Sequence, residues 1–327
     1  MSTMDFIRAL PKVELHRHLV GAASPAGLVR GADDIRTVVV GLARDLATQH
    51  VRYAEVMVAP YLHRTFGMAD AELLDGLAEG RKQAAAEHGV AFAWIFDIPG
   101  EYGPPAGHST VELAERAQPD GLVGLSLAGV EHGVRRRDFA GVFDRGFALG
   151  LHSVPHAGET AGVGEIWDAV RHLRAERVGH AVSAVRDRRL LDHLATHQIT
   201  VEVCPTSNLR TGAIASLDDH PVRRLLRAGV PVAVSTDAPP TFGATLCEEY
   251  AHVARIARLD HAGIARLAAG RPTLPLGRLT AARHAVPLGV STCAQPPKLR
   301  RVRGAPARAG GGRGRSSRGP APCGGTP

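Results

Sequence analysis

Two histidines close a short apolar segment near the N-terminus. The segment is KVELHRHLV, residues 12–20, and the histidines are His16 and His18, with only Arg17 between them. Residues i and i+2 of a β-strand point to the same side of a sheet, so both imidazoles would face the same way. Imidazole nitrogens bind zinc and related divalent ions, but a His-x-His pair alone is more often structural than metal-binding. Other parts of the chain must supply the remaining donors.

Four further polar residues follow apolar segments elsewhere in the chain. His156 lies in SVPHAGET, His180 in RVGHA and Asp237 in VSTDAPP, and Glu159 comes three residues after His156. Each residue alone has an ordinary structural explanation, such as a loop histidine after Pro155 or an aspartate that caps a turn. Their shared placement at the ends of predicted strands makes a common site the better interpretation.

Together these side chains carry the groups of a metal-assisted hydrolase. Three imidazoles and one carboxylate suit one Zn²⁺ ion per chain and leave a coordination position for water. The predicted metal ligands are His16, His18, His156 and Asp237. A carboxylic acid can protonate the electrophile while a histidine orients or deprotonates the water, and the carbon attacked is either a carbonyl or an amidine-type C–NH2 carbon. The predicted catalytic residues are Glu159, His180 and Asp237.

Alternating β-strands and α-helices would position these residues. Helical patterns lie between most of the predicted strands, for example at 33–50, 70–88, 164–176 and 220–229. Eight strands, most of them followed by a helix, predict a (β/α)8 TIM barrel, whose active site lies at the C-terminal ends of the strands. A doubly wound sheet is the alternative, but no G-x-G-x-x-G follows the first strand. The predicted strands are 12–16, 52–58, 91–98, 122–128, 151–157, 177–181, 199–204 and 231–236.

The composition is that of a protein with a buried core and no disulfide framework. Of the 327 residues, 44% are hydrophobic, which is enough for one large domain or two smaller ones. The cysteines are widely separated, which argues against disulfides and a cysteine-ligated zinc and suits a reducing compartment. The N-terminus is charged and has no long apolar run, so we expect a cytoplasmic protein without signal peptide or membrane span. The cysteines are Cys204, Cys247, Cys293 and Cys323.

The positive charge of the chain comes from its C-terminal part. The formal net charge is +7, but none of the 32 acidic residues lies beyond Asp260. The segment after it is rich in Arg, Gly and Pro and cannot bury enough apolar surface to fold. We therefore expect a folded domain at 1–270 and an irregular, solvated tail at 271–327, with no specific nucleic-acid partner and no membrane partner.

Six sequence blocks stand out between residue 6 and about residue 258: PKVELHRHLVGA, LVGLSLAGVEHG, PHAGET, RVGHA, EVCPTSNLRTGAI with HPVRRLLRAGVPV, and STDAPPTFGATLCEEY. In content and order they resemble the signature blocks of the adenosine deaminase family, within the metal-dependent amidohydrolases. The resemblance implies a TIM barrel with one zinc ion, attack of water at C6 of an aminopurine, and loss of ammonia. The cytidine deaminase signatures H-x-E and P-C-x-x-C are absent.

The resemblance also implies a role for each predicted site residue. The four metal ligands correspond to the family's zinc ligands. Glu159 matches the glutamate that protonates the purine ring nitrogen, and His180 matches the histidine that acts on the zinc-bound water. Gly129 matches the glycine whose backbone contacts the far side of the purine. Cys204, in CPTSN, is expected to be structural. The predicted substrate contacts are His18, Gly129 and Val20.

The chain departs from the family pattern at several positions. Ala238 follows Asp237 where the family usually has a second aspartate, which contacts purine N7. Val20 stands where many adenosine deaminases carry an aspartate near the ribose, and Ala181 replaces a glycine. Several dozen residues that usually follow GAASP and form helices over the pocket are missing, and the tail replaces the family's last helices. We therefore expect a barrel that is incomplete at the pocket lid and at the C-terminal helices.

The main functional prediction is zinc-dependent conversion of adenosine to inosine and ammonia. One alternative is deamination of another 6-aminopurine nucleoside, such as aminodeoxyfutalosine, which Val20 favours. A second alternative is a catalytically impaired relative, which Ala238 and the short first βα loop favour. In either active case the expected partner is a small purine nucleoside.

Overall fold

The structure of the protein is a computed structural model that describes residues 1–19 and 29–269. Val20, most of the first βα loop and the predicted tail, 271–327, lie outside these two ranges. The prediction that the tail replaces the family's last helices also falls outside them. The expectations for these segments stay predictions. Within the two ranges, no helix is both long enough and apolar enough to cross a membrane.

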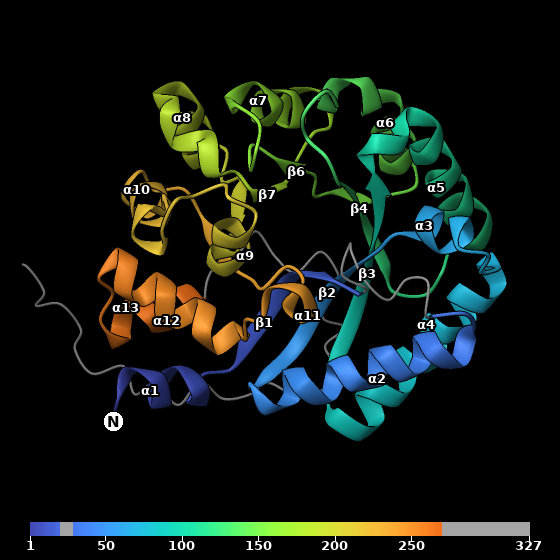
Figure 1. Cartoon of the computed structure of the whole chain (residues 1–327), viewed down its shortest axis with the longest axis horizontal. Helices are drawn as coiled ribbons and strands as arrows, with labels where there is room; N and C mark the ends of the chain where they lie inside the picture. The colour runs from blue at the N-terminus through green and yellow to red at the C-terminus, as the bar shows by residue number, and fades with distance from the viewer. Residues whose placement is uncertain (20–28, 270–327) are drawn as a thin grey trace, which may run out of the picture. The chain divides into compact units, whose positions relative to one another are not determined.

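Each of the eight predicted strands is present in the described residues, and every strand runs parallel to its neighbours (Figure 1). Two sheets result, with the strand orders β1-β2-β3-β4-β5 and β6-β7-β8-β9. The strands are β1 (Lys12–His18), β2 (Val51–Val58), β3 (Ala91–Pro99), β4 (Leu122–Ala128), β5 (His152–Ser153), β6 (His156–Ala157), β7 (Arg177–His180), β8 (Thr200–Val203) and β9 (Val232–Val234).

The predicted strand at 151–157 is divided into β5 and β6, and it links the two sheets. The backbone N–H of Val154 donates to the carbonyl of Leu125 on β4. At the next residue the chain turns to β7, where the N–H of Gly179 donates to the carbonyl of Pro155. Proline has no N–H, so the regular ladder breaks at this residue and the strand changes partners there.

Backbone contacts between the first and last strands close the barrel. Arg17 forms an isolated parallel bridge with Asp237. The N–H of His18 donates to the carbonyl of Asp237, and the N–H of Asp237 donates to the carbonyl of His16, both at 2.9 Å. The fold is therefore the predicted (β/α)8 TIM barrel. Its closure places β1 beside the segment that follows β9.

Helices surround the strands in Figure 1 and connect successive β units. The helices predicted at 33–50, 70–88, 164–176 and 220–229 are present as α2, α4, α7 and α10. The helices are α1 (Thr3–Ala9), α2 (Ala32–Thr48), α3 (Pro60–Thr65), α4 (Asp70–His88), α5 (Gly103–Ala117), α6 (Ala140–Ala148), α7 (Val163–His172), α8 (Arg188–Thr196), α9 (Pro205–Arg210), α10 (Val222–Arg227), α11 (Pro239–Phe242), α12 (Leu246–Ala257) and α13 (His261–Ala268).

The core has two parts because successive strand residues face opposite sides of the sheet. In β3, Phe92, Trp94 and Phe96 belong to the large cluster between strands and helices. Ala93 and Ile95 instead join two smaller apolar clusters, which the alternation places inside the barrel. Both faces of the strand are buried, which explains the nearly continuous apolar sequence of AFAWIFDIP.

Candidate metal centre and active site

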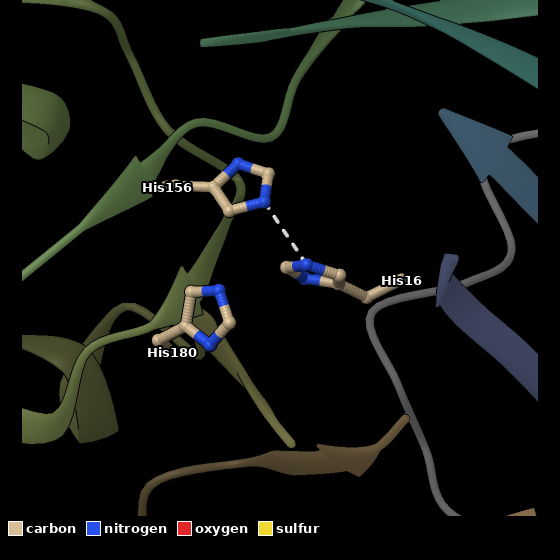
Figure 2. Close-up of side chains that lie close together, drawn as sticks. All are labelled: His16, His156 and His180. Atoms are coloured by element: carbon tan, nitrogen blue, oxygen red, sulfur yellow. Dashed lines mark hydrogen bonds between the residues drawn. The ribbon is translucent and has the colours of Figure 1, made fainter. Parts of the chain in front are cut away.

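Three histidines from three strands point toward one another (Figure 2). His16 lies on β1, His156 begins β6 and His180 ends β7. The Nε2 atoms of His16 and His156 are 3.0 Å apart. One ring nitrogen from each residue lies within 4.8 Å of the other two, and all three side chains are buried. The structure therefore gathers these predicted site residues into one cluster.

Closure of the barrel adds His18 and Asp237 to the cluster. Nε2 of His18 lies 3.2 Å from Nε2 of His156 and 3.4 Å from Oδ1 of Asp237. Nε2 of His16 lies 3.9 Å from the same oxygen. Two ligands of a tetrahedral zinc ion, each ~2.0–2.1 Å from the metal, are ~3.3 Å apart. The spacing of the donor atoms is thus compatible with a single divalent ion.

Second partners hold the rings of His16 and His156 from behind. Oε2 of Glu202 lies 2.9 Å from Nδ1 of His16, and Oγ of Ser126 lies 3.1 Å from Nδ1 of His156. When these oxygens accept the Nδ1 protons, the lone pair of each Nε2 is directed into the cluster. Metal-binding histidines need this orientation. Neither partner was predicted from the sequence.

His18 has a partner of the same kind, Asp97, whose carboxylate lies 3.5 Å from Nδ1 of His18. Burial raises the pKa of Asp97 to about 6, although His18 and Ser126 oppose the shift. Asp97 and Glu202 each lie within a buried parallel strand, in the sequences WIFDIP and TVEV. A carboxylate inside such an apolar run is the sequence signal that could have revealed them.

Burial and neighbouring charges set the protonation states in the cluster. Burial, and after it the neighbouring imidazoles, hold the pKa values of His16 and His156 well below 6.5. Burial raises the pKa of Asp237, but the imidazoles of His18, His180 and His16 outweigh burial and bring it below 3.8. At neutral pH both buried histidines are uncharged and the aspartate is ionised, as metal coordination requires. The cluster could therefore hold a divalent metal ion.

A buried arginine supports the ring of His16 from inside the barrel. Arg177 is fully buried and forms ion pairs with two buried carboxylates, those of Glu55 and Glu202. Its Nε donates to Oε1 of Glu202 at 2.6 Å. Burial raises the pKa of Glu202 and the guanidinium opposes that shift. The pairing offsets part of the penalty for burying a carboxylate beside His16.

The predicted acid and the predicted catalytic histidine lie at the edge of the cluster. Oε2 of Glu159 is 3.7 Å from Nε2 of His180, and that nitrogen is 4.0 Å from Oδ2 of Asp237. The other carboxylate oxygen of Glu159 accepts hydrogen bonds from Asn208 and Thr211. These distances bring the two predicted groups within reach of one bound molecule. The contact with Asn208 was not predicted.

Two buried side chains hold the loop that follows β6. The carboxylate of Glu131 accepts the backbone N–H groups of Thr160 and Ala161 at 2.6 and 2.7 Å. Nε of Arg136 donates to the carbonyl of His156 at 2.9 Å. Glu131 and Arg136 are buried and lie 3.6 Å apart. They therefore fix the backbone on both sides of the predicted acid.

Left-handed backbone conformations concentrate at the site. His180, Ala181 and Asp237 have φ values of 62°, 45° and 63°. Such conformations cost roughly 1–3 kcal/mol each and persist only where surrounding contacts hold them. At position 181 the glycine expected from the family would be less strained. Gly129 has φ 81°, a left-handed conformation that favours glycine.

Cys204 joins β8 to α9, and Ser207 lies in the first turn of α9. Cys204 is fully buried, and burial raises the pKa of its thiol, in agreement with a structural role. Oγ of Ser207 donates to Oδ2 of Asp237 at 2.5 Å. The same turn therefore supports a predicted metal ligand. Val20, the remaining predicted contact, lies outside the described residues.

A (β/α)8 barrel with histidines and a carboxylate gathered at the ends of its strands is the arrangement expected of a metal-assisted hydrolase. The family model described as adenosine deaminase matches residues 27–271. The chain belongs to the adenosine deaminase family, as the sequence blocks predicted. It is accordingly a deaminase-type hydrolase that acts on C–N bonds.

Curated relatives include deaminases with two substrates in their names. An aminodeoxyfutalosine deaminase from Streptomyces avermitilis is 43% identical over 307 residues, covering 81% of this chain and 86% of the relative. An adenosine deaminase from Erwinia tasmaniensis is 37% identical over 225 residues, covering 68% of this chain and 67% of the relative.

Solved structures with similar folds include an adenine deaminase from Arthrobacter aurescens. Its TM-score is 0.76 at 22% identity, covering 80% of this chain and 92% of that chain. An amidohydrolase from Burkholderia ambifaria, solved with bound zinc, has a TM-score of 0.76 at 22% identity, covering 82% of this chain and 86% of that chain. At this level of identity the likeness supports the barrel fold.

Proposed function

We propose that the chain is a zinc-dependent enzyme that hydrolyses the 6-amino group of a purine nucleoside, with aminodeoxyfutalosine as its substrate. The observation that carries the choice of substrate is the identity of 43% over 81% of the chain to an aminodeoxyfutalosine deaminase. The adenosine deaminase quoted above reaches 37% over 68%. This comparison favours the alternative over adenosine, the main prediction from the sequence.

One zinc ion per chain would be held by His16, His18, His156 and Asp237. When bound, zinc acts as a Lewis acid and lowers the pKa of a coordinated water to about 7. The proposal is supported by three imidazoles whose Nδ1 atoms already face oxygen atoms, and by a carboxylate that stays ionised. Neutral imidazole and carboxylate are ligands that zinc accepts.

Three side chains, those of Glu159, His180 and Asp237, would carry out the other steps of the hydrolysis. Glu159 donates a proton from Oε2 to the ring nitrogen next to C6, which makes C6 more electrophilic. His180 and Oδ2 of Asp237 orient the attacking water by hydrogen bonding. A proton of the water passes to Oδ2 of Asp237 and on to the 6-amino group while a C–O bond forms at C6. The C6–N bond then breaks, ammonia leaves, and the remaining hydroxyl proton returns to Glu159. The product is the corresponding 6-oxopurine nucleoside.

Three residues would contact the nucleoside itself. The side chain of His18 is 17% exposed, so its ring can touch a bound nucleoside as well as the metal. Gly129 offers its backbone directly after β4, in a left-handed conformation. Val20 offers no hydrogen bond to a ribose hydroxyl, which weakens the case for adenosine.

The test is a substrate screen on purified protein whose zinc content has been measured. Ammonia release is followed with aminodeoxyfutalosine, adenosine and 2′-deoxyadenosine as substrates. We expect kcat/KM for aminodeoxyfutalosine to exceed that for adenosine at least tenfold, a difference of about 1.4 kcal/mol. Equal or faster turnover of adenosine would contradict the choice of substrate. Absence of ammonia release from every nucleoside, with zinc bound, would instead support the impaired relative.

Restoring a carboxylate at position 238 should raise activity toward adenosine. Ala238 is buried directly after Asp237 and cannot accept a hydrogen bond from the purine. A charge-assisted hydrogen bond is worth about 1.5–3 kcal/mol, so Ala238→Asp should raise kcat/KM for adenosine by about ten- to a hundredfold. Ala238→Asn is the matched control for size and should gain less. No gain in the zinc-loaded Asp variant would point to the missing segment or to the substrate as the cause.

A further inference from the structure

The chain contains a single asparagine, Asn208, and it lies at the candidate active site. It belongs to α9, and its side chain is fully buried. Nδ2 of Asn208 lies 2.9 Å from Oε1 of Glu159 and 3.0 Å from Nδ1 of His180. One amide group therefore contacts the predicted acid and the predicted catalytic histidine at the same time.

His220 determines which end of this amide faces the site. The backbone N–H of Val222 donates to Nδ1 of His220 at 3.1 Å, so Nδ1 carries the lone pair. The ring is buried and neutral, with a pKa lowered by burial to about 3, and its proton is therefore on Nε2. Nε2 donates to Oδ1 of Asn208 at 3.2 Å. The NH2 end of the amide must then point toward Glu159 and His180.

The amide has a direct consequence for Glu159. Oε1 of Glu159 accepts one hydrogen bond from Asn208 and a second from Oγ1 of Thr211, at 2.9 and 2.8 Å. In a neutral carboxyl group, the oxygen that accepts two such bonds is the carbonyl oxygen, and the proton lies on the other oxygen. The acid proton is thus directed to Oε2, the oxygen nearer to Nε2 of His180.

The consequence for His180 concerns its tautomer. Because Nδ1 accepts an N–H from Asn208, the proton of the neutral ring lies on Nε2, which faces the cluster. An Nε2–H group has no lone pair for a metal, but it can donate a hydrogen bond to an oxygen atom. In His16 the order is reversed, because Nδ1 faces the carboxylate of Glu202 and Nε2 keeps its lone pair. The group that faces Nδ1 therefore determines whether Nε2 carries a proton, as in His180, or a lone pair that can bind a metal, as in His16.

We propose that Asn208 is a positioning residue with two functions. It holds Glu159 with the acid proton on Oε2, and it keeps His180 as an N–H donor that does not bind the metal. This inference rests on the proposed function, because Glu159 and His180 are assigned there. The experiments below distinguish a failure of this inference from a failure of the proposed function, because the last experiment does not depend on turnover.

Substitution of Asn208 should lower turnover while the metal stays bound. A misplacement of about 1 Å can cost about 10²-fold in rate, so we expect Asn208→Ala to lower kcat by about that factor, with a much smaller change in KM. Asn208→Asp should be at least as severe, because its carboxylate repels Glu159 and accepts Nδ1–H of His180. Zinc content should match the parent protein in both variants.

Thr211→Val is the matched control, because it removes one donor to Glu159 and leaves His180 untouched. We expect a loss of only a few-fold in kcat. If Asn208→Ala and Asn208→Asp turn over as fast as the parent, or if both lose zinc, the positioning role is wrong. A higher KM with an unchanged kcat would also contradict the positioning role.

Nuclear magnetic resonance gives a readout that does not depend on turnover. Because Asn208 is the only asparagine, protein made with asparagine labelled with ¹⁵N at the side-chain amide gives a single NH2 signal pair. In the zinc-loaded protein we expect two well-separated protons that exchange slowly with water. Glu159→Gln and His180→Phe should each shift mainly one of them. A pair at free-amide positions would overturn the inference, whether or not the protein deaminates any nucleoside.

Discussion

Glu159→Gln is expected to keep the zinc and to lower kcat by about 10²–10⁴-fold, the range that general acid catalysis contributes. Glutamine is nearly the same size and can still accept hydrogen bonds from Asn208 and Thr211 at its amide oxygen. What it lacks is a transferable proton at the position of Oε2. The purine ring nitrogen then stays unprotonated and C6 stays a poor electrophile. Single-turnover kinetics on zinc-loaded protein, with the best nucleoside from the screen, measures the loss.

A second Glu→Gln substitution controls for the loss of one negative charge. Glu176 lies just before β7, at the end of the strand opposite to His180, and pairs with His152 at 2.9 Å. Glu176→Gln should therefore leave kcat unchanged. If the rates of the Glu159 variant and the parent agree within a few-fold, Glu159 is not the proton donor.

Most of the barrel was predictable because its signals are local. Each predicted strand is a run of five to eight residues with at least one β-branched residue, bounded by turn signals. The closed barrel brings the ends of such strands together. His16 and His18 were placed on one strand and Asp237 at the end of another. Their meeting follows from closure between Arg17 and Asp237, which a strand count of eight already implies.

The partners of the site residues were not predictable in the same way. Glu202 is 186 positions from His16, and Asn208 is 49 positions from Glu159. No periodicity in the sequence links such pairs; only the fold does. The break at Pro155 is different, because a proline inside a predicted strand is a local signal for an irregular ladder.

The tautomers of the histidines also needed the structure. His16 and His180 look alike in the sequence, because each ends a run that is predicted to be a strand. One has a carboxylate at Nδ1 and the other an amide N–H group. The chemical difference between a metal ligand and a hydrogen-bond donor therefore lies in the neighbouring side chain rather than in the histidine.

His16→Ala and Asp237→Ala are expected to lose the zinc and all measurable deamination. Each of the four donor atoms lies 3.0–3.9 Å from two of the others. Removal of one donor leaves three, so the affinity for zinc falls. Metal analysis should give about one zinc per chain in the parent and much less in the variants. His152→Ala is the control, since this half-exposed histidine pairs with Glu176 and lies outside the cluster.

The same loss should be visible in stability, because a ligand that binds only the folded state stabilises it. At a free zinc concentration 100 times Kd the gain is about 2.7 kcal/mol. Zinc should therefore raise the Tm of the parent and of His152→Ala, and leave that of His16→Ala unchanged. The metal assignment fails if the parent binds no divalent ion, or if the zinc content of His16→Ala equals that of the parent. Tm and zinc content together distinguish a misfolded variant from a folded variant that lacks the metal site. A misfolded variant would have a low Tm with and without zinc. A folded variant without a metal site would keep the Tm of the zinc-free parent.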